Sequence, residues 1–175
     1  MRNLAVLLFR LVLGGLLAGH GAQKLFGWFN GPGIEGTSGF MEMLGLKRGR
    51  PWAYLAGGSG FGVSVLTALG LLHPVGPVFV TGSMAMATTT AHGGKSIWVT
   101  EGGAELPVTN IAGARAIILG GPGKWSLDRA LGIQLPAWIA PLGLAIVILT
   151  LIYAERASDM PQDQDEAREE LAGEE

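Results

Sequence analysis

The stretch of sequence that decides the fold occupies residues 4–27 and reads LAVLLFRLVLGGLLAGHGAQKLFG. Residues 4–22 are long and apolar enough to cross a bilayer, whose hydrocarbon core of about 30 Å takes roughly 20 helical residues. Arg10 interrupts this run, and His20 and Lys24 follow near its end. Ionisable groups at membrane depth are energetically expensive, so their presence here indicates a function.

Four later segments have the same apolar character, at residues 52–72, 75–91, 106–121 and 136–153. Only 15% of the chain is charged and 49% is hydrophobic, whereas a soluble domain carries about 25% charged residues. We therefore predict an all-α integral membrane bundle, in which the first run is a retained helix and not a cleaved signal.

Two glycine pairs predict where these helices approach each other closely. They are Gly15-x-x-x-Gly19 in the first span and Gly58-x-x-x-Gly62 in the second. Small residues at this spacing let two helix backbones come into contact.

Composition also excludes several classes of chemistry. The chain has no cysteine, so it carries no disulfide, thiolate metal site or iron–sulfur cluster of its own. Its basic residues are few and dispersed, which argues against nucleic-acid binding. We predict no metal site and no intrinsic cofactor.

The regions outside the spans are predicted as a long first loop and an acidic tail. A short amphipathic helix is expected around residues 38–45, lying at the membrane interface. Residues 155–175 hold nine acidic residues against Arg156 and Arg168, a composition typical of disorder. We divide the chain into a bundle at 1–132, an additional transmembrane helix at 133–154 and this tail.

Five crossings place the two ends of the chain on opposite sides of the membrane, and the basic residues predict which side is which. Seven basic residues share the side of the first loop and the tail, and three lie on the other side. The positive-inside rule then predicts a cytoplasmic C-terminus. The seven are Lys24, Lys47, Arg48, Arg50, Lys95, Arg156 and Arg168, and the three are Arg2, Lys124 and Arg129.

Alternating crossings bring distant polar residues to one membrane face. His20 and Lys24 end the first span, His92 and Lys95 end the third, and Glu101 and Glu105 precede the fourth. His73 falls on the opposite face. Glu105 is expected to pair with Lys24 or Lys95.

Two arginines are predicted to lie at a similar depth inside the bundle. Arg10 lies about 15 Å from His20 along the first helix, and Arg115 lies the same distance from Glu105. No acidic residue lies in any span at that level. Arg10, Gly14, Gly21 and Lys24 share one face of the first helix and are expected to line a groove.

This constellation is compatible with more than one ligand. A quinone ring could accept hydrogen bonds from His20, Lys24 or Arg115, with histidine supplying protons. Two arginines also suit a transported anion or polar solute, and a haem between His20 and His92 is a remote alternative. The candidate ligand-binding set is Arg10, His20, Lys24, His92, Glu105 and Arg115.

At these residues the chain resembles the DoxX family of small membrane proteins. The resemblance rests on Arg10 and Gly14 followed by His20-Gly21-x-x-Lys24-Leu25-Phe26-Gly27, then on His92-Gly93 and Gly102-Gly103-x-Glu105. It continues through the run from Gly120 to Asp128, for which we favour a structural role, with Asp128 capping the next segment or pairing with Lys124 or Arg129. It spans about residues 4–132.

The resemblance implies a four-helix membrane core, here followed by a fifth helix, in a bacterial plasma membrane. The family name is linked to a thiosulfate:quinone oxidoreductase subunit, and some relatives are linked to membrane redox complexes. It therefore implies a redox-associated subunit or accessory with a quinone-like pocket and with soluble or membrane redox partners. Many relatives carry a glutamate near the position of Ser59 or Gly60, which this chain lacks. A small transporter and a non-catalytic scaffold are the alternatives.

Overall fold

The computed structural model describes residues 1–43 and 48–158, and this part of the chain is helical without strands. The five predicted spans are each found as a helix whose bounds differ from the prediction by a few residues. These helices are α1 (Arg2–Phe26), α3 (Gly49–Leu69), α4 (Val75–Thr90), α5 (Glu105–Gly120) and α7 (Ile139–Ser158). The shorter elements are η1 (Trp28–Asn30), α2 (Gly33–Met43), η2 (Val99–Glu101) and α6 (Leu127–Leu131).

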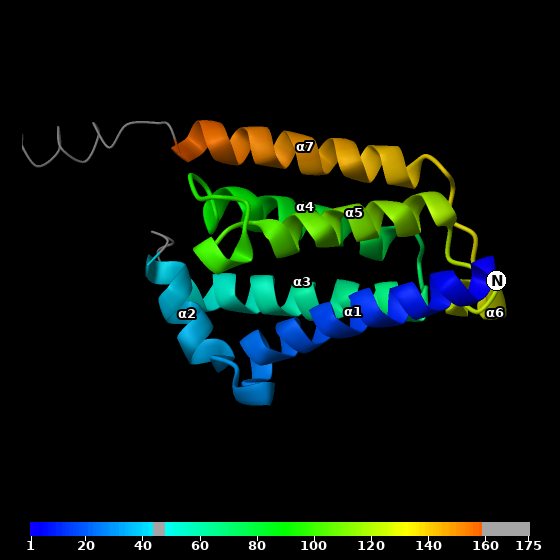
Figure 1. Cartoon of the computed structure of the whole chain (residues 1–175), viewed down its shortest axis with the longest axis horizontal. Helices are drawn as coiled ribbons and strands as arrows, with labels where there is room; N and C mark the ends of the chain where they lie inside the picture. Colours follow the sequence, from blue (N-terminus) through cyan, green and yellow to red (C-terminus); the bar gives the residue numbers. More distant parts are fainter. Residues whose placement is uncertain (44–47, 159–175) are drawn as a thin grey trace, which may run out of the picture.

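The long helices run up and down in three layers (Figure 1). The helix α3 packs against α1 and α4, and α4 in turn packs against α5 and α7. The alternation brings the C-terminal ends of α1 and α4 to the end of the bundle where α2 lies. The N-terminus, the connection between α3 and α4, and α6 lie at the other end.

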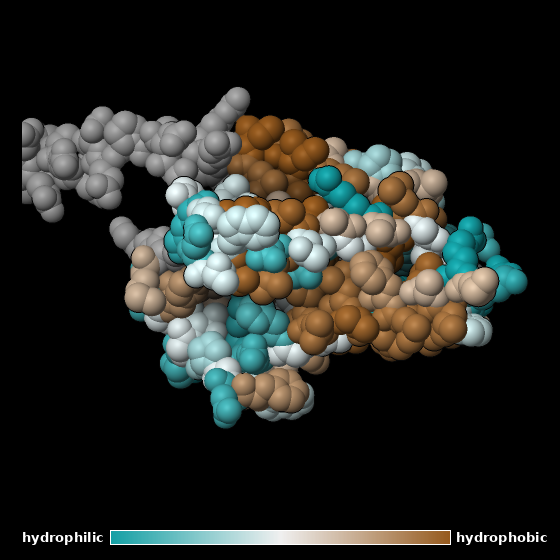
Figure 2. All heavy atoms as spheres, viewed as in Figure 1, coloured by the Kyte–Doolittle hydropathy of each residue, from teal (hydrophilic) through white to brown (hydrophobic). Residues whose placement is uncertain are grey.

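The surface between these two ends is apolar. Figure 2 shows hydrophobic side chains over α1 and over α7, with hydrophilic groups gathered toward the ends. In the described part of the chain, α1 and α3 are long and apolar enough to cross a membrane, and Ile139–Ile152 within α7 is a shorter apolar helix. Exposed apolar surface on this scale is typical of contact with lipid or with another protein.

The predicted glycine contacts are wrong, because other glycines make them. A Cβ added at Gly15, Gly58 or Gly62 would meet nothing within 4 Å. A Cβ at Gly14 would lie 2.6 Å from the backbone nitrogen of Ala68, and one at Gly21 would lie 2.5 Å from that of Phe61. The seven-residue spacing of Gly14 and Gly21 keeps both on the face that packs on α3.

The first loop folds back onto the bundle. The helix α1 ends at Gly27, whose left-handed conformation (φ 69°) turns the chain. The helix α2 begins five residues earlier than expected, and its buried Thr37 donates a hydrogen bond to the carbonyl of Lys24 (3.2 Å). Residues 44 and 45 of the predicted helix lie outside the described residues.

The last helix is longer than predicted. The helix α7 continues to Ser158, so the expected boundary at residues 154 and 155 falls inside it. The rest of the acidic segment, residues 159–175, lies outside the described residues.

Candidate functional site

Arg10 lies at the end of the bundle that holds the N-terminus, and it is 1% exposed. Its guanidinium donates hydrogen bonds to the carbonyls of Pro122 and Trp125, the latter at 2.8 Å. Its Nε is buried without a partner among the described residues. The face predicted as an open groove is therefore closed, because α3 covers Gly14 and Gly21 and the 122–125 turn covers Arg10.

Asp128 lies at the same end of the bundle, which holds the N-terminus, the connection between α3 and α4, and α6, and which we call the closed end. Its carboxylate accepts hydrogen bonds from the backbone nitrogens of Leu72 (2.7 Å) and His73 (2.8 Å), and its own nitrogen donates to the carbonyl of Gly70 (3.1 Å). The negative charge of its carboxylate interacts electrostatically with the guanidinium of Arg10. We call Arg10, Gly70, Leu72, His73 and Asp128 the Arg10–Asp128 cluster.

The cluster corrects one expectation and agrees with two others. Asp128 does not cap its own helix, since the side chain of Ser126 accepts the hydrogen bond from Arg129 N (3.2 Å) that caps α6. An acid does reach the level of Arg10, but it comes from a connecting segment and not from a span. The structural role expected for the run from Gly120 to Asp128 agrees with these contacts.

His73 lies at this closed end, away from the predicted site as expected. Burial lowers the pKa of its imidazole, while the charge of Asp128 and a hydrogen bond with the backbone of Ile118 act in the opposite direction. The charge of Arg10 adds to the lowering. The neutral imidazole is therefore favoured in the folded protein.

His20 and Lys24 lie at the opposite end of the bundle, which holds α2 and the C-terminal ends of α1 and α4, and which we call the open end. His20 is exposed, and its Nδ1 is 3.1 Å from Oε1 of Gln23 in the next turn of α1. Lys24 is half-buried beside α3. Lys24 lies in the last turn of α1, as expected, whereas the helix continues past His20 to Phe26.

His92 and Glu105 lie at the same end and fasten the connection between α4 and α5. The Nδ1 of His92 is 2.7 Å from the carbonyl of Gly102, and Oε2 of Glu105 accepts a hydrogen bond from the nitrogen of Val99 (3.0 Å). Lys95 donates to the carbonyl of Ala91 (3.3 Å). These bonds take the place of the expected ion pair with Glu105.

Arg115 does not join either end. It is exposed on α5, so the expectation that both arginines are buried is wrong, while their similar depth stays a prediction. The reason is rotational: Arg10 faces the core of the bundle, whereas Arg115 faces outward. Of the six predicted residues, the structure thus brings His20, Lys24, His92 and Glu105 to one end and separates Arg10 and Arg115 from them. That these residues bind a ligand stays a prediction.

Metal-ligating side chains do not gather within the part of the chain that the structure describes. No group of three or more histidine, aspartate or glutamate side chains there could hold a metal ion.

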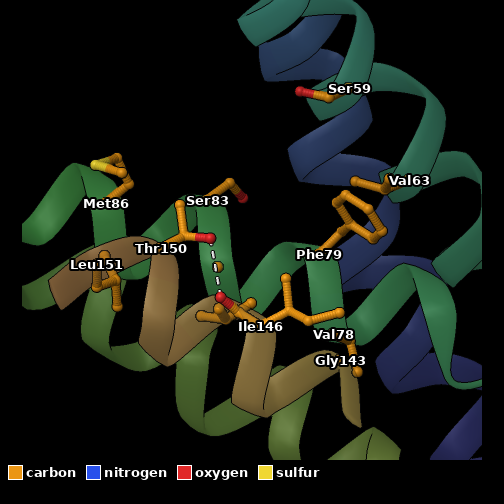
Figure 3. A pocket seen from close by; sticks show the side chains of 12 residues that line it. Ser59, Val63, Val78, Phe79, Ser83, Met86, Gly143, Ile146, Thr150 and Leu151 are labelled. Atoms are coloured by element: carbon orange, nitrogen blue, oxygen red, sulfur yellow. Dashed lines mark hydrogen bonds between the residues drawn. The ribbon is translucent and has the colours of Figure 1, made fainter. Parts of the chain in front are cut away.

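A groove of about 340 Å³ lies between α3, α4 and α7 (Figure 3). Its walls are mainly apolar, and three hydroxyl groups line it, one from each helix: Ser59, Ser83 and Thr150. None of the six predicted residues lines it. The sequence offers one signal for it, the hydroxyl of Ser83 within the apolar run 75–91. The remaining lining residues are Val63, Val78, Phe79, Gly82, Met86, Gly143, Ile146, Val147 and Leu151.

A second cavity of about 330 Å³ adjoins the closed end. Asp128, Arg129 and Gln134 supply its polar lining, together with the backbone around Pro122 and Gly132. Because both oxygens of Asp128 already accept backbone hydrogen bonds, the carboxylate is committed to the fold.

Helices of membrane-spanning length with an apolar exterior define an α-helical membrane protein. The model of the DoxX family matches residues 5–93, a segment that contains α1 to α4 and about half of the chain. The chain therefore belongs to the DoxX family and is a membrane protein. Comparison with curated proteins and with solved structures finds no match.

Proposed function

We propose that this DoxX-family protein is a redox-associated membrane subunit or accessory that binds a quinone-like lipid in the groove between α3, α4 and α7. In this proposal α1, α3, α4 and α5 form the membrane core, and α7 crosses the bilayer beside α4. The observation that carries the proposal is the groove itself, which is apolar, bears hydroxyl groups and opens on the lipid-facing surface.

The position of the groove favours a ligand that arrives through the bilayer. Phe79 on α4 and Ile146 on α7 line it and are each more than half exposed. A volume of about 340 Å³ lies at the lower end of the range for small-molecule sites. It suits one ring and the start of an apolar tail.

Hydroxyl groups could hold the carbonyl oxygens of such a ring. Ser83 donates to the carbonyl of Val80 (3.1 Å). Thr150 donates to the carbonyl of Ile146 (2.9 Å), the bond drawn in Figure 3. A hydroxyl rotates to suit its partner, so either proton can turn from its own helix to a ligand. Ser59 projects from the third wall.

The bound quinone would supply reversible two-electron chemistry, and electrons would come from a soluble or membrane redox partner. His20 and Lys24 at the open end are candidates for meeting that partner. An anion site formed by Arg10 and Arg115 is not favoured, because Arg10 is hydrogen-bonded to two backbone carbonyls and Arg115 is exposed on α5.

In this proposal the chain lies in a bacterial plasma membrane, and the charge distribution supports a cytoplasmic C-terminus. Among the described residues outside the helix interiors, Lys24, Arg48, Arg50 and Lys95 belong to the open end, and Arg2, Lys124 and Arg129 belong to the other. The excess of basic residues at the open end follows the positive-inside rule. A reporter fused to residue 175 that proved external would contradict this orientation.

Ligand binding can be measured with a decyl-substituted benzoquinone and the full chain in lipid nanodiscs. We expect Ser83→Leu, which fills the groove, to weaken binding about tenfold or more. Thr150→Val should weaken it less, by removing one hydroxyl. Thr109→Val is the matched control, because Thr109 also bonds the carbonyl four residues earlier but lies on α5, outside the groove.

Two results would overturn the proposal. One is quinone binding that is unchanged in Ser83→Leu but lost in His20→Ala and Lys24→Ala, which would move the ligand to the open end. The other is equal binding of decylbenzene, which lacks the carbonyl oxygens and would show that the groove holds only hydrocarbon.

A further inference from the structure

The helix α5 leaves one long face uncovered by the rest of the bundle. It packs mainly on α4 and to a smaller extent on α1. Its exposed residues recur at spacings of three and four, which places them in one stripe along the helix. The stripe consists of Val108, Thr109, Ala112, Arg115, Ala116 and Leu119, and Leu119 is 89% exposed.

Arg115 gives this stripe a charge at membrane depth. It lies ten residues from the start of α5 and five from its end, about 15 Å and 7.5 Å along the axis. Side chains of a helix lean toward its N-terminus, so Arg115 leans toward the more distant water.

The described residues of this chain do not neutralise Arg115. The ion pair found among them joins Arg50 and Glu35, at the open end. Asp128, the buried acid nearest the same end of α5, is bound to the backbone of Leu72 and His73. The acidic segment follows α7, whose C-terminus lies at the opposite end of the bundle from the C-terminus of α5.

A second copy of the chain cannot neutralise it either. Symmetric packing of two α5 stripes would place Arg115 against Arg115, a repulsive contact at low dielectric. Residues 106–120 hold no acid, and neither do α1, α3, α4 or the first sixteen residues of α7. Charge complementarity therefore requires a carboxylate from a different protein.

We propose that the α5 stripe is the docking surface for a transmembrane helix of another membrane protein, and that this helix carries an Asp or Glu at the depth of Arg115. Ala112 and Ala116 are small residues four apart, which lets a partner backbone approach closely. The carboxylate and the guanidinium would then form a charge-assisted pair shielded from water. The surface lies outside the quinone groove, so either proposal can fail while the other stands.

The test uses a synthetic transmembrane peptide as the partner. A Leu/Ala helix of about 23 residues with one Glu, placed at the depth of Arg115, is compared with the same peptide carrying Gln. Energy transfer from the labelled full-length protein to the peptide is measured in liposomes of zwitterionic phosphatidylcholine. We expect the Glu peptide to associate about three- to tenfold more strongly than the Gln peptide.

Two variants in the stripe, each with a control variant outside it, assign the association to the stripe. Arg115→Leu should abolish it, and circular dichroism should show the same helix content, because the residue is exposed. Arg2→Leu, which removes a cation at the bundle end, should keep it. Ala112→Phe should block both peptides by bulk, whereas Leu149→Phe on the exposed face of α7 should not.

Equal association of the two peptides with the unmodified protein would overturn the proposal, as would a preference that persists in Arg115→Leu. A third outcome would also overturn it. If adding phosphatidylglycerol abolishes the Glu preference through Arg115-dependent lipid binding, the residue is a ligand for lipid phosphate and not for a partner helix.

Discussion

The two ends of the bundle differ in how deeply their ionisable residues are buried and in how far along the chain their hydrogen-bond partners lie. At the closed end, Arg10 and Asp128 are 1% and 4% exposed, and each bonds to backbone groups of a distant segment. At the open end, His20 is exposed and the bonds of His92 and Glu105 stay within one connection. Both ends use ionisable side chains in contacts between helices, but among the described residues the buried charged side chains are Arg10 and Asp128 of the closed end, whereas the pair of Arg50 with Glu35 at the open end is exposed.

This difference shows that burial and the range of the contacts, not residue type alone, separate structural charges from available ones. Arg10 and His20 lie on the same helix, and both looked functional for the same reason. Arg10 reaches over 112 residues of sequence to Pro122, whereas His20 reaches three residues to Gln23. Removing charges should therefore affect stability at one end far more than at the other.

The largest expected effect is at Asp128. Asp128→Ala leaves the backbone N–H groups of Leu72 and His73 without their buried acceptor, so it should lower the free energy of unfolding by about 2–6 kcal/mol. The matched variant at the open end is Glu105→Ala, which frees one N–H and should cost about 1 kcal/mol. Thermal unfolding of both proteins in detergent would measure this, and equal losses would refute the contrast between the ends.

Two glycines provide the next comparison, because both have a positive φ. Gly70 (φ 62°) belongs to the closed end and Gly94 (φ 73°) to the open end. Alanine costs about 1 kcal/mol at either for the left-handed backbone. At Gly70 its Cβ would also collide with the Arg10 guanidinium, while at Gly94 it would meet nothing within 4 Å.

Gly70→Ala should therefore be less stable than Gly94→Ala by a further 1–3 kcal/mol or so. Urea titrations of the two variants would show the difference. Similar midpoints would mean that the closed end is not tightly packed.

A smaller effect should follow pH through His73. Its folded-state pKa is lowered by burial, so the unfolded chain binds more protons as pH falls below about 6.5. Stability is then fully present above the unfolded pKa and decreases as pH falls toward the folded one. Thermal scans between pH 8 and pH 5 should show this slope, and His73→Gln should flatten it. A slope that His73→Gln leaves intact would assign the effect to other groups.

The smallest effect is expected at the surface pair of the open end. Arg50 and Glu35 are 3.0 Å apart, but their side chains are 61% and 76% exposed. Pairs of this kind contribute about 0–1 kcal/mol and are screened by salt. Glu35→Gln should therefore change the unfolding midpoint only marginally, and a large loss would show that α2 depends on this pair.

Much of the fold could be predicted from the sequence because hydrophobic length determines where membrane helices lie. Alternating crossings also placed His20, Lys24, His92 and Glu105 at one end. The partners of Arg10 could not be predicted, since they depend on how the turn after α5 folds back, which no local pattern encodes. The direction of Arg115 and the choice between Gly14 and Gly15 depend on helix rotation, which the weak amphipathicity of these spans leaves undetermined.

The groove was missed for a related reason. Its walls come from α3, α4 and α7, and its apolar lining cannot be told from any lipid-facing surface in the sequence. Only the packing of α7 against α4 shows that Ser83 and Thr150 share one space. In α7, Gly143 allows this contact, because a Cβ there would lie 2.7 Å from a methyl group of Val78.

The walls of the groove differ in whether they belong to the segment that matches the DoxX family. The α3 and α4 walls lie within the segment that the DoxX model matches, and the α7 wall lies beyond it. Because α7 makes no bond in the Arg10–Asp128 cluster, its inner face can change in shape and polarity while the rest of the bundle keeps its anchorage. Under the proposed function, substitutions in this one helix would alter the ligand preference of the groove without disturbing the Arg10–Asp128 cluster.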